Sequence, residues 1–224
     1  MNVLAFDCAV SGLGVAVMRD GACLADVTQE GRDQAAQLLP AIATALVQAG
    51  IDRRALSLIA VTVGPGSFTG VRVGLAAARG LSLGLGVPLA GLSTTAVLVA
   101  QAPSGGGRLV VAAIDSRLGD WFCAIGEGGA PFVASADEVA LRLAGCACLV
   151  VGTGIQALVE QLVAAGIDAT AEETVPDPVS LGRLASQVGV ETWRAQNRRE
   201  GLPRPLYLRG VNITLPDGAR RTVD

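Results

Sequence analysis

Apolar residues follow two different periodicities along the first hundred residues of the chain. Short, nearly continuous apolar runs predict β-strands at 2–7, 12–18, 22–28, 58–63 and 88–92. Stretches with an apolar residue at every third or fourth position predict helices over 33–49, 71–85 and 94–102. A turn at 19–21 makes the first three strands an antiparallel meander, after which helices and strands alternate. This order predicts a mixed sheet flanked by helices.

The opening pattern recurs after a Gly- and Ser-rich linker at 103–107. An offset of 108 places Asp7 on Asp115 and Ala16 on Ala124, so that in both places an apolar strand ends in Asp before a loop and a second strand. A helix is then predicted near 136–143, followed by a strand at 147–151 and a turn at 152–154. A second helix runs from this turn to 165, and a long helix is predicted at about 178–196. We therefore expect a duplicated α/β unit with lobes at 1–103 and 108–224, the last helix packing back on the N-terminal lobe.

Two residue types that many enzymes depend on are missing from the composition. There is no histidine, and all 17 basic residues are arginine, so lysine is absent too. This excludes Ser-His-Asp and Cys-His nucleophiles, histidine-based zinc sites, a Walker lysine and a pyridoxal-phosphate anchor. The five cysteines form no C-x-x-C pair, which favours small buried apolar residues in a reducing compartment over disulfides or zinc.

The chain carries no segment that we interpret as a membrane anchor or signal peptide. Asp7 interrupts the first apolar run, and no basic region precedes it. The uncharged stretch 80–107 is broken by several glycines and by Pro88, which is typical of a helix end, a strand and a new helix. We expect a soluble, cytoplasmic protein.

Charge is unevenly distributed along the sequence. Residues 183–224 contain eight arginines and four acids, net +4, whereas the rest contains nine arginines and sixteen acids, net −7. The basic end could contact RNA or an acidic partner through Arg194, Arg198, Arg199 and Arg204, or could be a solvated face.

Two strand ends could form a phosphate site. Asp7 precedes a loop containing Ser11, and Asp115 precedes Ser116. Acids at strand ends beside Gly/Ser turns can hold a metal-bound phosphate, while backbone N–H groups hold its oxygens. The alternative is that each Asp only caps a turn. The turn at 152–154, which could approach an adenine or ribose, is equally consistent with a plain strand-to-helix connection.

A glycine-rich loop at 64–70 follows a buried strand and opens a helix. It is neither a Walker loop nor a dinucleotide fingerprint, although its helix-start N–H groups could bind an anion near Arg72 and Arg79. Small residues then recur every four positions on one ridge, at Gly70, Gly74, Ala78 and Ser82. Interior glycines cost a helix about 1 kcal/mol each relative to alanine, so the ridge indicates close backbone approach to another element, in this chain or in another subunit.

The segment 64–74, GPGSFTGVRVG, resembles the motif of the TsaB/YeaZ family of bacterial tRNA threonylcarbamoyladenosine synthesis. The resemblance extends over nearly the whole chain, through 4–7, 38–40, 86–93, 113–117 and 205–210. It implies a duplicated actin/Hsp70-like (ASKHA) fold. It also implies a non-catalytic subunit that pairs with the catalytic paralogue TsaD or with itself, is joined by the ATPase TsaE, and meets tRNA through the complex.

The family pairs through its first two helices, here 33–49 and 67–85. The resemblance thereby implies a partner interface made by Leu38, Leu39, Ile42, Leu46, Phe68, Gly70, Arg72, Val73, Gly74, Ala77, Ala78 and Leu81, with the small-residue ridge allowing close packing between subunits.

The chain departs from the family at two places. Where members carry a His-Ser pair before Leu-Leu-Pro, it has Asp33-Gln34-Ala35-Ala36-Gln37, and the usual Asp-Thr-Ser-Thr phosphate loop is Asp7-Cys8-Ala9-Val10-Ser11. We expect the chain itself to require no cofactor or metal, with ATP or Mg²⁺ acting in the complex. The alternatives are a nucleotide-binding ASKHA enzyme with Asp7 and Asp115 around Mg-ATP, and a peptidase, which would have to work without histidine.

Overall fold

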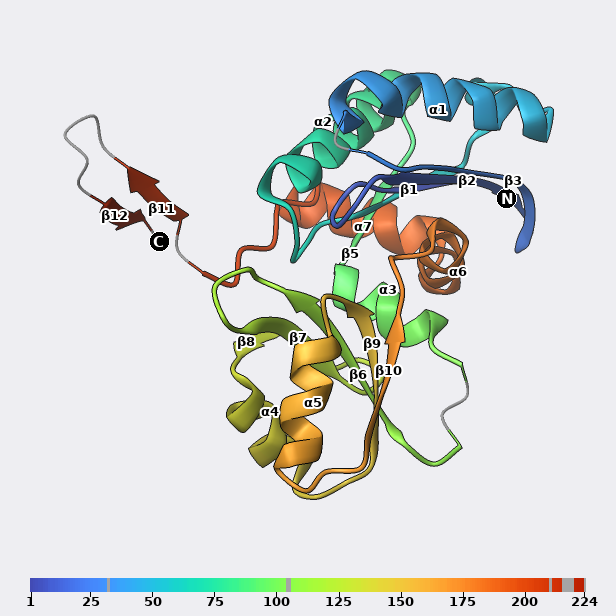
Figure 1. Ribbon diagram of the computed structural model, residues 1–224. Helices are drawn as coiled ribbons and strands as arrows, with labels where there is room; N and C mark the ends of the chain where they lie inside the picture. Colours follow the sequence, from blue (N-terminus) through green and yellow to red (C-terminus); the bar gives the residue numbers. More distant parts are fainter. Residues whose placement is uncertain (32, 104–105, 210, 215–219, 224) are drawn as a thin grey trace.

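Two five-stranded sheets with the same strand order form the body of the molecule (Figure 1). The computed structural model describes the chain except residues 32, 104–105, 210, 215–219 and 224, so part of the predicted linker lies outside the described residues. The first sheet has the order β3-β2-β1-β4-β5, and the second the order β8-β7-β6-β9-β10. In each, the central strand pairs antiparallel with its hairpin partner and parallel with the strand that follows a helix. The predicted duplication of an α/β unit is confirmed.

The strands agree closely with the apolar runs of the sequence. They are β1 (Asn2–Asp7), β2 (Leu13–Arg19), β3 (Ala22–Gln29), β4 (Leu58–Thr62), β5 (Leu89–Leu92), β6 (Leu109–Asp115), β7 (Trp121–Ile125), β8 (Phe132–Ala134), β9 (Cys148–Thr153) and β10 (Ala169–Glu173). β8 is only three residues long, and β10 is mostly exposed and polar, so neither shows the apolar run by which the other strands were predicted.

The second hairpin is one residue shorter than the first. Asp7 pairs with Gly14, seven positions on, whereas Asp115 pairs with Trp121, only six positions on. When β1 and β6 are aligned on Asp7 and Asp115, equivalent residues are 108 positions apart. In the following strands, β2 and β7, equivalent residues are only 107 positions apart. The predicted match of Ala16 with Ala124 is wrong by one residue, because a shorter loop shifts the register of everything that follows it.

Helices cover both faces of the first sheet. α1 (Gln34–Ala49) and α2 (Phe68–Leu85) lie side by side on its outer face (Figure 1). Their buried residues pack on Leu4, Phe6, Ile59 and Val61 of the sheet. α2 begins three residues earlier than predicted, because the Ser67 side chain accepts a hydrogen bond from the Gly70 N–H at 3.2 Å and caps the helix at Phe68.

The predicted long helix at 178–196 is two helices. α6 (Pro178–Val188) and α7 (Val190–Glu200) are separated at Gly189, whose φ of +89° and ψ of 148° no helix contains. Both pack on the inner face of the first sheet, where Leu181, Ala185 and Trp193 join its core. The chain thus returns to the first sheet after completing the second.

α3 (Thr94–Gln101) lies between the two sheets (Figure 1). Its Leu98 packs with Ala112, Ile114 and Val151 of the second sheet, while Val97 joins the core beneath the first. The opposite face of the second sheet is covered by α4 (Ala136–Leu143) and α5 (Gln156–Ala164).

Three smaller elements complete the described chain: a 3₁₀ turn (Arg53–Ala55) and a two-stranded hairpin of β11 (Val211–Thr214) and β12 (Arg220–Val223), which projects from the body (Figure 1). Among the described residues, no helix combines the length and apolar character needed to cross a bilayer.

Candidate functional site

A pocket of about 740 Å³ opens between the lobes. It is formed by the loops that follow β1, β4, β6 and β9, which is where open α/β sheets bind ligands. Its lining includes Ser11, Ser67 and Thr69 from the first lobe and Asp115 and Arg117 from the second. Of the three residues predicted to hold a phosphate, Ser11 and Asp115 therefore face the same space.

Asp7, the third predicted residue, is not part of that lining. Its side chain is only 3% exposed. Its Oδ1 accepts hydrogen bonds from the Thr62 hydroxyl and from the Ala9 N–H, the latter at 3.1 Å. Burial raises the pKa of Asp7 to about 6, and these two hydrogen bonds only partly oppose that shift. No cation of the described residues pairs with it.

The second-lobe side of the pocket is already engaged by the protein's own groups. The Asp115 carboxylate accepts the N–H of Arg117 at 2.7 Å. At the start of α5, the Glu173 carboxylate accepts the N–H groups of Gly154 and Ile155 at 3.1 and 3.0 Å. Backbone donors that would hold a ligand's anionic oxygens at a helix start are thus satisfied by an internal carboxylate.

These residues do not fit a magnesium nucleotide. Asp115 is exposed to the pocket, but Asp7 is buried beneath the loop and has a raised pKa, so the pair does not present two carboxylates to one cation. In the described parts of the chain no group of three or more acids or cysteines is arranged to hold a metal ion. The arrangement of Asp7 and Asp115 around Mg-ATP stays a prediction, against which the burial of Asp7 argues.

The small-residue ridge of α2 faces the protein's own sheet. A Cβ on Gly70 would overlap the carbonyl oxygen of Cys8, and one on Gly74 would lie 3.4 Å from Val61 Cγ2. Ala78 and Ser82 are buried as well. Intrachain packing of α2 on β1 and β4 is sufficient to explain the ridge, and contact of Gly70, Gly74 and Ala78 with another subunit stays a prediction.

The other predicted interface residues divide by exposure. Leu38 and Ile42 are buried under α1, and Leu46, Val73, Ala77 and Leu81 are half-buried. Leu39, Phe68 and Arg72 are exposed. The prediction missed two of the most exposed apolar side chains, Val47 at 81% and Leu83 at 73%. Val47 continues the helical spacing of Leu39 and Ala43 along α1 and could have been found from that pattern.

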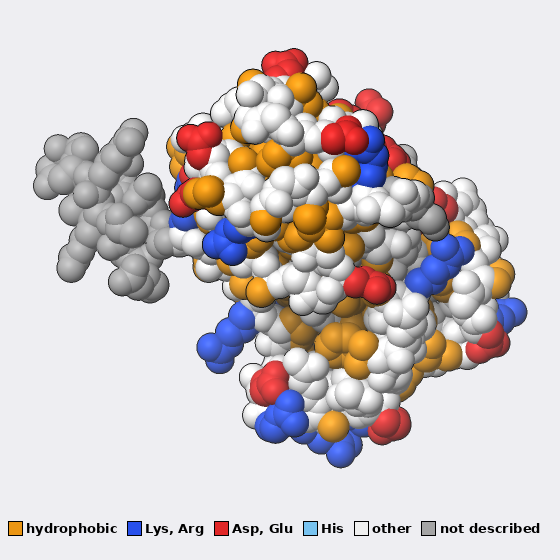
Figure 2. Space-filling model, turned by 90° about the horizontal axis from the view of Figure 1, so that it is seen from below, with side chains coloured by type: hydrophobic (Ala, Val, Ile, Leu, Met, Phe, Trp, Pro, Cys, Tyr) orange, Lys and Arg blue, Asp and Glu red, His pale blue; other side chains and the backbone are white. Residues whose placement is uncertain are grey.

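The outward face of α1 and α2 is almost free of charge. α1 contains no charged residue in its sixteen positions, and α2 contains only Arg72 and Arg79. Solvent-facing helix surfaces normally carry charged and polar side chains. On the opposite side of the molecule, side chains of both signs are scattered over the surface (Figure 2).

The arginine-rich end is partly neutralised by the chain itself. Arg194 pairs with Glu191 at 3.5 Å, and Arg199 pairs with Glu200 at 2.5 Å. Arg198 and Arg204 are exposed. Because two of these four arginines are paired with acids, a continuous phosphate-binding surface is less well supported. The contact with RNA stays a prediction.

Residues 202–209, which we call the strap, cross from the first lobe to the second. The Arg79 guanidinium donates to the Pro203 carbonyl, and the Leu206 N–H donates to the Val63 carbonyl at 2.7 Å. Arg209 forms an ion pair with Asp120 of the β6–β7 loop. Sequence reasoning did not identify the strap, because it has no periodic pattern.

Comparisons with known proteins agree with this architecture. Residues 28–128, which include α1 and α2, match the family model TsaD, tRNA N6-adenosine threonylcarbamoyltransferase. The Escherichia coli tRNA threonylcarbamoyladenosine biosynthesis protein TsaB is 36% identical over 125 residues, covering 55% of this chain and 54% of the relative. The match thus spans about half the length of that curated relative.

Two solved structures from Pseudomonas aeruginosa extend the likeness over the whole fold. One is described as an uncharacterized protein with similarity to peptidase YEAZ, with TM-score 0.76 and 29% identity, covering 93% of this chain and 99% of that one. The other is YeaZ, with TM-score 0.73 and 27% identity, covering 92% and 99%.

The doubled sheet with a pocket between its lobes defines a protein of the actin/Hsp70-like (ASKHA) class. Within that class, the chain is similar to proteins of the TsaB/YeaZ family, over about half of its length in sequence and over nearly all of it in structure.

Proposed function

We propose that this chain is the non-catalytic subunit of the bacterial complex that makes threonylcarbamoyladenosine beside the tRNA anticodon. Its role is to bind and activate a catalytic TsaD-like paralogue in the cytoplasm. A TsaE-like ATPase joins that pair, tRNA is met through the complex, and the chain forms a homodimer when alone. The names of the relatives and the match of residues 28–128 to the TsaD model support this assignment.

The observation that carries the proposal is the uncharged outward face of α1 and α2. Leu39 is 57% exposed, Val47 81% and Leu83 73%, and no acidic side chain interrupts them on either helix. Exposed apolar patches of this kind mark protein interfaces. The same helices fall within the segment that resembles the TsaD family, so one face suits both a paralogue and a second copy.

A catalytic role fits the residues poorly. The chain has no histidine, its pocket does not fit a magnesium nucleotide, and Asp7 is withdrawn from the solvent. ATP or Mg²⁺ would then act at the level of the complex. The same lack of histidine removes the conventional zinc and serine centres that a peptidase would need.

The test is binding of the TsaD-type subunit from the same genome, measured by calorimetry. Val47→Glu, at a site 81% exposed, should weaken the heterodimer at least about tenfold, because the new charge must be buried in the interface. Leu141→Glu is the matched control: Leu141 is 79% exposed, but on α4 of the second lobe, and its affinity should stay within about twofold of the wild type.

The activity arm uses the reconstituted complex. Modified tRNA should form only when both subunits are present, and Val47→Glu should lower its yield in parallel with the affinity. Equal affinity of the wild type and Val47→Glu for the TsaD-type subunit would contradict the assignment of the interface to α1 and α2. Modification of tRNA by this chain alone would contradict the non-catalytic role.

A further inference from the structure

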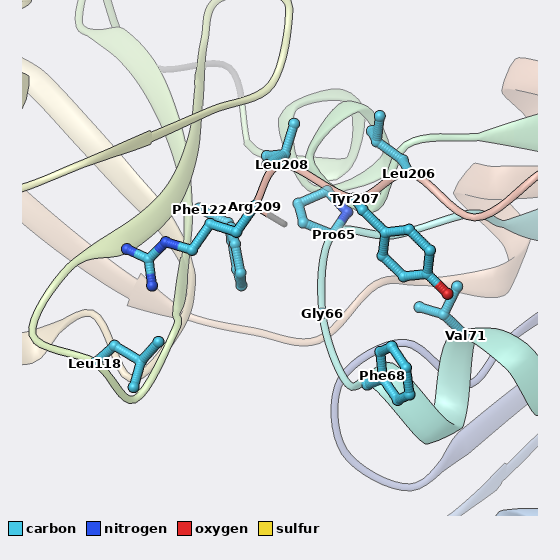
Figure 3. Close-up of a pocket in the computed structure, with 10 residues that line it drawn as sticks. All are labelled: Pro65, Gly66, Phe68, Val71, Leu118, Phe122, Leu206, Tyr207, Leu208 and Arg209. Atoms are coloured by element: carbon cyan, nitrogen blue, oxygen red, sulfur yellow. The ribbon is translucent and has the colours of Figure 1, made fainter. Parts of the chain in front are cut away.

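An apolar pocket of about 360 Å³ lies beside the interlobe pocket, at the start of α2 (Figure 3). Phe68, Val71 and Pro65 form its first-lobe side, and Leu118 and Phe122 form its second-lobe side. The strap closes it with Leu206, Tyr207 and Leu208. Three parts of the chain far apart in sequence thus build one hollow, whose volume lies within the range of pockets that bind small ligands, about 300–1,000 Å³.

One rim of the pocket is a stacked cluster of Phe68, Arg72 and Tyr207. The two rings are 5.8 Å apart, and the Arg72 guanidinium lies 3.5 Å from the Phe68 centroid. Arg72 Nε donates to the Tyr207 hydroxyl at 2.8 Å, which fixes the cluster. Phe68 and Tyr207 nevertheless stay 44% and 43% exposed. Rigid, half-exposed aromatic and arginine side chains around a pocket are typical of binding hot spots.

The chemistry of the lining selects the kind of occupant. The side chains facing the hollow are nearly all apolar, so the donor and acceptor groups of a nucleobase would be buried there without partners. An apolar side chain leaves no polar group unpaired in the same place and gains from leaving water.

Charge at the rim adds a second requirement. Within the described residues no carboxylate pairs with Arg72, nor with Arg117 of the neighbouring loop, whereas Arg209 is paired with Asp120. Arg72 also stands on α2 one turn from Phe68, where the uncharged outward face and the pocket meet. An occupant that bears a carboxylate next to its apolar group would match both features.

We propose that this pocket anchors one apolar side chain of the partner subunit, with a neighbouring carboxylate of that subunit meeting Arg72. The proposal rests on the proposed function, since the partner is the one that binds the face of α1 and α2. It deepens that function by extending the contact across the strap to Leu118, so that the partner engages both lobes.

Leu118→Glu tests the anchor, because Leu118 is 71% exposed on a loop and its replacement leaves the core intact. Calorimetry with the TsaD-type subunit should show a loss of affinity of about tenfold or more. Leu141→Glu again serves as the control, at a site of similar exposure. Arg72→Gln should cause a smaller loss that shrinks at high salt, as expected of an exposed charge pair.

The outcomes separate this inference from the function on which it rests. Wild-type affinity of Leu118→Glu together with loss in Val47→Glu would overturn the anchor and leave the α1/α2 interface standing. Wild-type affinity of both would overturn the two together. If Leu118→Glu kept its affinity for the partner but bound an anticodon-loop RNA more weakly, the anchor would be overturned and the occupant would be a nucleobase. If it kept that affinity but its homodimer dissociated, the anchor would likewise be overturned and the occupant would be a second copy.

Discussion

At the scale of single residues, Asp7 is an acid buried at the end of a central strand. It lies beneath a loop and pairs with no cation in the described part of the chain, so ionisation there is opposed by desolvation. Its Oδ1 takes both available hydrogen bonds, from Thr62 and from Ala9. The sequence placed this acid at a strand end correctly, but burial turned it from a ligand toward the pocket into a structural group under it.

Replacement of Asp7 by asparagine is expected to stabilise the protein at neutral pH. The folded state keeps its proton up to about pH 6, whereas the unfolded chain releases it near pH 3.8, so the free energy of unfolding falls as pH rises between these values and stays lower above them. Asp7→Asn keeps the Oδ1 acceptor but cannot ionise, so it should raise the free energy of unfolding by up to about 3 kcal/mol at pH 7.5 and by little at pH 4. Thermal melts at both pH values, with Asp115→Asn as the exposed control, measure it. A lower melting temperature of Asp7→Asn at pH 7.5 would show that the charge is stabilising.

At the scale of elements, a single backbone position decides how the chain returns to the first sheet. Apolar spacing continues from α6 toward α7, which is why the sequence predicts one helix over 178–196. Gly189 breaks it with a backbone conformation that is essentially reserved for glycine. The break lets Leu181 and Ala185 on one helix and Trp193 on the next reach the same core.

Gly189→Ala is expected to destabilise the protein by about 1–3 kcal/mol, since a Cβ there meets nothing within 4 Å and the cost is purely conformational. Gly80→Ala provides the contrast. Its Cβ also meets nothing, but Gly80 lies inside α2 with helical geometry, so alanine should add up to about 1 kcal/mol. Urea unfolding of the wild type, Gly189→Ala and Gly80→Ala measures the two changes in stability. Equal stability of the two variants would show that the backbone at 189 relaxes into a helical conformation.

At the scale of the whole molecule, the two halves of the sequence exchange helices. α3 follows the first sheet in sequence but packs on the second, and α6 and α7 follow the second sheet but pack on the first. The division at 1–103 and 108–224 stays a prediction of sequence units. Physical coupling between the lobes passes through α3 and the strap, so the relative position of the lobes depends on contacts that no single half contains.

Leu98→Ala tests that coupling. Leu98 is fully buried against Ala112, Ile114 and Val151, and its truncation should cost about 2–5 kcal/mol. Amide hydrogen exchange should accelerate in strands of both sheets. Leu158→Ala, equally buried but inside the second lobe's own core, should accelerate exchange only there. Confinement of the Leu98→Ala effect to one sheet would argue against α3 as the link.

Much of the local structure was predictable because buried strands and amphipathic helices leave periodic patterns. The runs ending at Asp7 and Asp115 became the central strands, and the α1 pattern predicted that helix to within a residue. β10 and the strap left no such pattern, since β10 is largely exposed and the strap is held by a backbone hydrogen bond to Val63 and by the Arg79 side chain. Among candidate site residues, the α2 ridge was read from spacing alone, which cannot distinguish a face packed inside the chain from one packed on a partner.

The sequence by itself determined the doubled α/β units, the limits on chemistry that follow from having no histidine or lysine, and an uncharged α1. These depend on local pattern and composition, which a chain carries without folding. Only the tertiary structure decided which side of α2 faces outward, that Asp7 lies under the pocket while Asp115 lines it, and that Phe68, Leu118 and Tyr207 enclose one hollow. Each of these depends on contacts between residues far apart in the chain, whose geometry is set when the sheets, α3 and the strap pack together.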